Sequence, residues 1–131
     1  MTTLSAVLFG ATVSVFVLPV FERYKIGSQA AHAMKSLGDA DSSYALVRWQ
    51  EETTIYYLHS GDRLVRIGGA KDFLKFYSQP NTVVGVEDRE FDAVINMLPP
   101  ELRNSLEFST VQGLDYTRGL KPKTIYLVRS K

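Results

Sequence analysis

The sequence contains no cysteine, and only two histidines occur among its 131 residues. A chain without cysteine forms no disulfide, offers no thiolate to a metal and has no thiol nucleophile, so these classes of site are excluded. The sequence therefore gives no indication of the redox state of the compartment in which the protein resides. Neither His32 nor His59 has further ligands at the spacing of a metal motif, and we expect no metal and no other cofactor.

Charge is absent from the front of the chain. Residues 2–21, TTLSAVLFGATVSVFVLPVF, hold none of the 15 basic and 14 acidic side chains, all of which lie from Glu22 onward. The net charge of +1 gives no global reason to expect nucleic acid as a partner. From Arg103 onward basic residues outnumber acidic ones. A basic tail near a membrane could touch anionic lipid, although a solvated strand end and loop is the plainer interpretation.

The uncharged segment has the length and composition of a membrane span. About 20 apolar residues at ~1.5 Å each cross a hydrocarbon core of ~30 Å. Apolar side chains occupy every face of the expected helix, and its few hydroxyls can bond back to its own backbone. Phe21 and Tyr24 suit the membrane interface, with Arg23 and Lys25 as headgroup anchors. We predict a transmembrane helix at 1–21, a soluble domain at 22–131 and membrane lipid as a partner.

Two alternatives stay open for this segment. A secretory signal peptide would have a basic start and a small-residue cleavage site close behind the apolar run, but the first such site, Ala31-His32-Ala33, lies far downstream. A fully buried core helix is the other alternative, although a small domain has little room to surround one. For a span, the positive-inside rule would put Arg23, Lys25 and Lys35 in the cytoplasm, provided that Met1 is the true start.

The remainder alternates between helical and strand patterns. The apolar spacing predicts a helix over about 22–37 that continues closely from the span. Strands are expected at 44–49, 64–67 and 82–86, separated by helices at 51–58 and 70–77. Asp88 is expected to cap a further helix that Pro99-Pro100 ends, and strands at 106–111 and 124–129 can pair antiparallel across a loop at 112–123.

Strand–helix–strand repeats with short connections indicate crossovers and a parallel core. The predicted fold class is therefore α/β. One N-terminal transmembrane helix is followed by a small three-layer domain with a mainly parallel sheet of about five strands.

Few residues form a pattern typical of chemistry. Gly68-Gly69-Ala70-Lys71 lies where phosphate loops occur but lacks their motif, so a tight turn explains it. Glu51 and Glu52 are adjacent on an expected helix and cannot form a catalytic pair, so we interpret them as an exposed helix start. The chain has no visible catalytic residues. Tyr56, Tyr57 and Arg63 are the candidate substrate-binding cluster, because they lie just beyond the carboxyl end of the first strand.

The order of segments is that of a known family. An apolar helix ending in Val17-Leu18-Pro19 precedes FERYKIGSQAAHAMKSL, the strand YALVRW, and TIYYLHSGDRLVRI, which is similar to an aromatic-Tyr-Leu-x-x-x-Arg pattern. Over almost the whole chain this layout resembles the C-terminal tail of bacterial membrane glycosyltransferases of the aminoarabinose-transferase and protein-mannosyltransferase-like superfamily. Those enzymes move a sugar from a polyprenyl-phosphate donor to a lipid or protein acceptor. Their catalytic carboxylates belong to an early loop that has no counterpart here.

The resemblance implies that the chain is a non-catalytic C-terminal module of such an enzyme, with the missing transmembrane part as its partner. It also implies a bacterial inner-membrane protein with the soluble domain on the periplasmic side, and we prefer this orientation to the charge-based one. The alternative, from a different class, is a free-standing membrane-anchored interaction or binding protein unrelated to sugar transfer.

Overall fold

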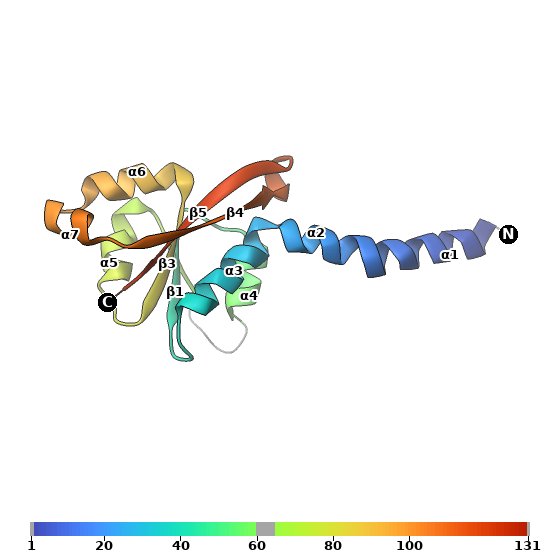
Figure 1. Cartoon of the computed structure of the whole chain (residues 1–131), viewed down its shortest axis with the longest axis horizontal. Coiled ribbons are helices and arrows are strands. Elements are labelled where there is room, and N and C mark those ends of the chain that lie inside the picture. The colour runs from blue at the N-terminus through green and yellow to red at the C-terminus, as the bar shows by residue number, and fades with distance from the viewer. Residues whose placement is uncertain (1, 60–64, 131) are drawn as a thin grey trace.

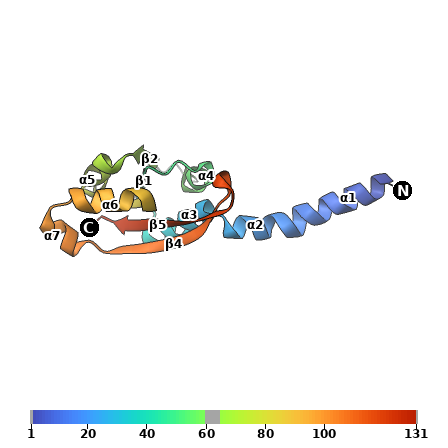
Figure 2. The same cartoon turned by 90° about the horizontal axis from the view of Figure 1, so that it is seen from above.

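An exposed apolar helix leads into a mixed α/β domain (Figure 1). The structure is a computed structural model that describes residues 2–59 and 65–130. The helix and the domain lie end to end, so the N-terminus is the point farthest from the sheet in both Figure 1 and Figure 2.

The leading helix is built from three segments that follow one another without a break: α1 (Thr2–Thr12), the π-helical turn η1 (Val13–Val17) and α2 (Leu18–Tyr24). The π turn precedes Pro19, and the Leu18 N–H donates to the carbonyl of Val13. The ring of a helical proline clashes with the carbonyl four residues before it, and a widened turn relieves this clash.

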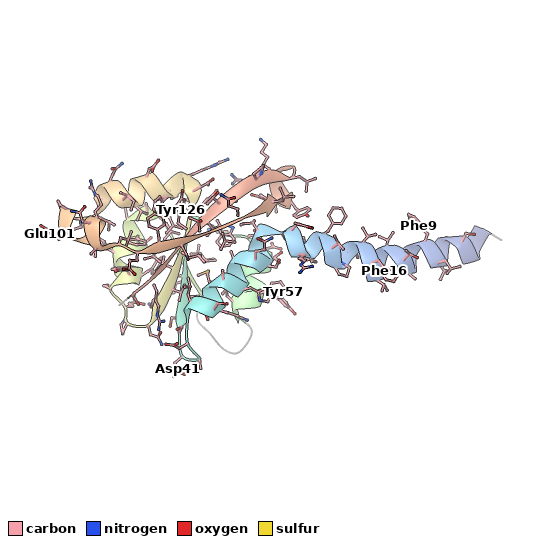
Figure 3. The ribbon with its side chains drawn as sticks, in the orientation of Figure 1. Phe9, Phe16, Asp41, Tyr57, Glu101 and Tyr126 are labelled. Carbon is pink, nitrogen blue, oxygen red and sulfur yellow. The ribbon has the colours of Figure 1, made fainter. Side chains whose placement is uncertain are left out.

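Residues Ser5–Tyr24 form a helix long and apolar enough to cross a membrane, and none of it is buried in the structure. Such a helix can span a membrane or serve as a signal sequence. The alternative of a buried core helix is wrong, because Phe9 and Phe16 are 74% and 68% exposed and project freely (Figure 3).

The predicted continuous helix over 22–37 is wrong, because the chain breaks at Lys25. Lys25 has extended backbone angles (φ −64°, ψ 129°), and α3 (Ile26–Leu37) begins directly after it. The break has a visible cause: Lys25 makes a β-bridge to Leu114, so its backbone is drawn to the edge of the domain instead of continuing the helix.

Five strands and the helices between them make up the rest. They are β1 (Ser43–Val47), α4 (Glu52–His59), β2 (Val65–Gly68), η2 (Ala70–Asp72), α5 (Phe73–Tyr77), β3 (Thr82–Glu87), α6 (Asp88–Met97), α7 (Pro100–Ser105), β4 (Phe108–Asp115), η3 (Tyr116–Arg118) and β5 (Lys121–Arg129). Glu87, not Asp88, is the cap residue of α6. Pro99-Pro100 ends α6 as predicted, but Pro100 also begins α7, because proline suits the first turn of a helix.

The sheet has the order β2-β1-β3-β5-β4 and is mixed, so the prediction of a mainly parallel sheet is wrong. β1 pairs parallel with β2 and β3, whereas β5 pairs antiparallel with both β3 and β4. The expected loop at 112–123 is mostly strand, since β4 and β5 are longer than predicted and turn over η3. The long hairpin therefore places β5 inside the sheet, where it pairs with β3.

The two faces of the sheet are covered by different helices, which gives three layers (Figure 1). Alternate side chains of β1 divide between the two cores: Tyr44 and Leu46 pack with α3 and α4, and Ala45 and Val47 pack with α5 and α6. Side chains that alternate along a strand point to opposite faces, so a strand buried on both faces reads as a continuous apolar run.

Candidate site at the carboxyl end of the parallel strands

An open cleft of about 660 Å³ lies at the end of the sheet nearest the apolar helix. It is formed by the segment after β1, the end of β3, the β4–β5 hairpin and the joint between α2 and α3. Its lining residues are Lys25, Arg48, Trp49, Gln50, Glu51, Glu52, Thr53, Glu87, Asp115, Tyr116, Thr117, Arg118 and Lys123.

The topology explains why a cleft forms at this place. The connection after β1 leads outward to β2, and the chain then returns to β3 on the other side of β1. The segments that follow β1 and β3 therefore diverge, and open α/β sheets bind their ligands in the crevice that such a reversal leaves at the carboxyl ends of the strands.

A buried cation joins two buried acids at the base of the cleft. The Nζ of Lys123 lies 3.1 Å from Glu87 Oε1 and 3.4 Å from Asp115 Oδ2, and all three side chains are at most 10% exposed. Arg118 approaches Glu87 at 4.0 Å from the rim. Two carboxylates around one ammonium leave the base of the cleft with excess negative charge, which Arg118 offsets only loosely.

Asp115 is held in its ionised form. Burial alone would raise its pKa, but hydrogen bonds from Thr117 and the charge of Lys123 outweigh this and set the pKa of Asp115 below its ordinary value. The Thr117 hydroxyl and backbone N–H donate to Asp115 Oδ1 at 2.6 and 3.0 Å. These hydrogen bonds connect Thr117, in the turn between β4 and β5, to Asp115 in the cleft.

The pKa of Glu51 is shifted in the opposite direction to that of Asp115. Burial, and then the negative charge of Asp115, raise the pKa of the Glu51 carboxyl above its ordinary value, against smaller opposing effects of Lys123, Trp49 and Lys25. Its carboxyl lies against the backbone of α3, where a Cβ added to Gly27 would meet Glu51 Oε1 at 2.7 Å. Glu51 is thus half-buried, and its interpretation as part of an exposed helix start is wrong.

Buried polar atoms beside Glu51 lack partners within the described residues. Trp49 is 2% exposed and lines the cleft, yet its indole Nε1 makes no hydrogen bond of normal geometry, although it lies near enough to Glu51 to lower its pKa slightly. The hydroxyl of the fully buried Thr54 is unpaired as well. Buried polar groups are nearly always paired, and the Glu51 carboxyl, with which the Trp49 side chain interacts, is an acceptor available to the indole N–H.

Backbone strain occurs at another residue that lines the cleft, Arg48. Arg48, directly after β1, has φ +57°, and its N–H donates to the carbonyl of Gly68 at 2.7 Å. A left-handed conformation is uncommon for a residue other than glycine, and such residues cluster at functional sites. Its guanidinium, 69% exposed, stands over the rim and reaches Glu90 at 3.8 Å.

The apolar helix meets the cleft through hydrogen bonds. The last carbonyls of α2 accept from domain side chains: Phe21 from the Tyr116 hydroxyl at 3.2 Å, Glu22 from Ser28 at 2.8 Å, and Arg23 from Gln29 at 2.8 Å. A helix end leaves four such carbonyls without intrahelical partners. Side chains that fill this role from a different element fix the direction in which the helix leaves the domain, and Tyr116 is also part of the cleft wall.

The predicted interface residues lie at this joint. Phe21, Arg23 and Tyr24 are exposed on α2. Lys25 instead turns back, forms an ion pair with Glu22 and lies 5.8 Å from the ring centre of Tyr116. The hydrogen bond to Glu22 raises the pKa of Lys25.

The two tyrosines of the predicted binding cluster lie farther along α4. Tyr56 is 75% exposed, and its ring packs edge-on against Tyr57, with 5.5 Å between centroids. The ring of Tyr57, labelled in Figure 3, also lies 6.0 Å from that of His32 by centroid distance. Neither tyrosine lines the cleft, and Arg63 lies outside the described residues. A binding role for the three residues stays a prediction.

The sequence pattern did not single out the residues that line the cleft base. Glu87 ends β3, whereas Asp115 and Lys123 lie on the two arms of the β4–β5 hairpin, so the cluster joins segments that are distant in the chain. In the sequence their charges are typical of ordinary solvated residues. One signal was available in the sequence. Glu87 and Asp115 are each the last residue of a strand, and an acid that is buried at such a position needs a cation nearby. No group of three or more His, Asp or Glu side chains with metal-binding geometry occurs in the described residues.

Comparisons of the chain with protein-family models, with curated proteins and with solved structures found no match in any of the three.

Proposed function

We propose that the chain is a non-catalytic, membrane-anchored module that binds the polar headgroup of a membrane-embedded substrate in its cleft. One observation carries the proposal: the helix that can span a membrane is hydrogen-bonded to Tyr116, a residue of the cleft wall. If Ser5–Tyr24 spans a bilayer, the cleft opens at the bilayer surface, where lipid headgroups lie.

The groups in the cleft fit a hydroxyl-rich headgroup. A hydroxyl can donate to the carboxyl of the half-buried Glu51, which lines the cleft. The hydroxyls of such a headgroup would face the acids at the base of the cleft. A phosphate attached to it would face the cations Arg48 and Arg118 at the rim. Polar ligands of this kind are oriented by a few well-placed groups in a largely preformed pocket.

In its more specific form, the module is the C-terminal part of a membrane glycosyltransferase that moves a sugar from a polyprenyl-phosphate donor to a lipid or protein acceptor. The layout of the segments supports this form, and the mixed α/β domain behind one apolar helix is compatible with it. The domain would then lie outside the cytoplasm of a bacterial cell, on the periplasmic side of the inner membrane, beside the missing transmembrane part.

Binding can be tested with the full chain in lipid nanodiscs. A polyprenyl-phosphate sugar, the same lipid without the sugar, and lipid A are titrated separately. Glu51→Gln is expected to weaken binding of the sugar-bearing lipid about tenfold, equivalent to ~1.4 kcal/mol. The exposed Glu101→Gln, at the far end of the domain, is the matched control. Absence of binding by the unaltered chain would remove the ligand role.

The glycosyltransferase form has a separate test. The chain is co-expressed with the membrane bundle of such an enzyme that lacks its own C-terminal domain, and sugar transfer is measured. We expect restored transfer, reduced by Tyr56→Ala and Arg63→Ala if the predicted cluster takes part. Headgroup binding without any effect on transfer would instead support the alternative of a free-standing membrane-anchored binding protein.

A further inference from the structure

The tip of the β4–β5 hairpin carries an apolar side chain between two cations. Leu120 is 52% exposed, and the side chain of Arg118 is 51% exposed. Lys121 is exposed on the other side, and the sequence contains no acid after Asp115. An apolar side chain flanked by cations is the composition that favours the surface of an anionic membrane.

The tip lies beside the end of the apolar helix. The hydroxyl of Tyr116 donates to the carbonyl of Phe21, and the two rings meet edge-on with 6.3 Å between centroids. Phe21 belongs to the Ser5–Tyr24 segment that can span a membrane. Figures 1 and 2 both show the hairpin turn next to α2, on the side of the domain from which the helix leaves. The tip is therefore at the level of the helix end.

The backbone of the tip holds Leu120 outward. Gly119 and Leu120 have φ values of +76° and +59°, so two successive residues adopt the left-handed conformation. Glycine does so freely, but a bulky residue such as leucine rarely does. Leu120 belongs to neither hydrophobic core, and strain of this kind persists only where the surrounding structure holds it.

We propose that the 116–121 tip is a second membrane contact, which inserts Leu120 into the interface of an anionic bilayer while Arg118 and Lys121 bind headgroup phosphates. This inference rests on the membrane anchoring proposed above. One leucine and two cations would not hold a soluble protein to a membrane. Tethered by the helix, however, they act at a high effective concentration, so weak contacts are sufficient. The contact would orient the cleft toward the headgroups.

The absence of cysteine makes the test direct, because each single-cysteine variant of the full chain takes a nitroxide label at one position. Labels are placed at Leu120→Cys, at Phe16→Cys inside the apolar helix, and at Glu101→Cys at the opposite end of the domain (Figure 3). The chain is reconstituted in vesicles of equal parts phosphatidylglycerol and phosphatidylcholine. Accessibility to oxygen reports lipid, and accessibility to a water-soluble nickel chelate reports water.

We expect the label at 120 to be more accessible to oxygen and less accessible to nickel than the label at 101. In ~1 M salt, where the Debye length falls to ~3 Å, it should move toward the values at 101. Arg118→Gln combined with Lys121→Gln should produce the same loss, whereas the exposed pair Lys71→Gln and Lys75→Gln should not.

The outcomes separate the two proposals. A label at 16 that reports water would remove the membrane anchor itself. A label at 16 in lipid with a label at 120 fully in water would remove only the second contact. Burial of position 120 that is independent of lipid charge and grows with protein density would indicate contact between copies of the chain, and this would also overturn the inference.

Discussion

Lys123 is the residue on which the buried charges of the cleft depend. Its ammonium lies between Glu87 and Asp115, and all three side chains are almost fully buried. Removing one partner of a buried ion pair leaves an uncompensated charge, which costs far more than the pair contributes.

Lys123→Met is accordingly expected to lower the free energy of unfolding by about 3–5 kcal/mol. Urea unfolding of the full chain in mild detergent, followed through the fluorescence of the single, buried Trp49, measures the change. Lys121→Met, two residues away and exposed, is the matched control and should change stability by less than about 0.5 kcal/mol. Equal effects of the two substitutions would mean that the cluster is solvated.

Glu51 and Asp115 should make opposite contributions to the pH dependence of stability. The pKa of Glu51 is raised in the fold, so its ionised form is less stable there than in the unfolded chain, and stability falls as the pH rises from its unfolded pKa through its folded pKa. The pKa of Asp115 is lowered, so its contribution is present above its unfolded pKa and is lost as the pH falls through its folded pKa.

Glu51→Gln should therefore be more stable than the unaltered chain at neutral pH, and the difference should vanish below about pH 4, near the unfolded pKa of glutamate. Asp115→Asn should be less stable at neutral pH. Thermal unfolding measured across this range tests both signs. A Glu51→Gln variant that is destabilised at neutral pH would show that the ionised carboxylate is favoured in the fold.

Among the elements, the contact of α3 with β4 depends on a glycine. A Cβ added to Gly113 would lie 2.8 Å from the Cα and 3.0 Å from the N of Ile26, both backbone atoms that cannot rotate away. Gly113 therefore permits the close approach that places the hairpin beside the joint of α2 and α3.

Gly113→Ala should destabilise the domain by about 1–3 kcal/mol, because overpacking forces the backbone to shift. Gly69→Ala, at a position where nothing lies within 4 Å, is the control. Hydrogen exchange would show faster opening of β4 in the first variant and not in the second. Unchanged exchange in both would mean that α3 and β4 separate at little cost.

The sequence predicted the elements better than their arrangement. The apolar helix, the five strands and their approximate positions followed from local patterns, and the pairing of the last two strands was confirmed as antiparallel. The position of β5 between β3 and β4 depends on pairing between distant segments, which no local pattern encodes. The break at Lys25 is of the same kind, since its cause is a bridge to Leu114.

The same distinction applies to the cleft. Sequence reasoning placed Tyr56, Tyr57 and Arg63 beyond β1 as a binding cluster, and their role stays a prediction. The cleft also lies beyond β1, at Arg48 and Trp49, but neither tyrosine lines it. The burial of Glu51 arises because its carboxyl lies against Gly27 of α3, a tertiary contact between residues whose local sequence predicted only a helix start and an amphipathic helix.

For the whole molecule, the central expectation is that the apolar helix resides in lipid. Expressed in a bacterium, the full chain should stay with the membrane fraction after extraction with alkaline carbonate. Phe16→Arg should release a large share of it, because an arginine near the centre of a span costs about 2.5–3.5 kcal/mol. Phe108→Arg, at a half-exposed position on the edge strand β4, is the control. Complete extraction of the unaltered chain would contradict a span.

The hydrogen-bonded joint has a mechanical consequence. A span longer than the local hydrocarbon thickness accommodates by tilting. Because Tyr116, Ser28 and Gln29 hold the last carbonyls of α2, the domain would rotate together with the helix as it tilts. Bilayer thickness would then change the height of the mouth of the cleft above the membrane surface, so that the cleft would face different depths of the headgroup region in thin and thick membranes.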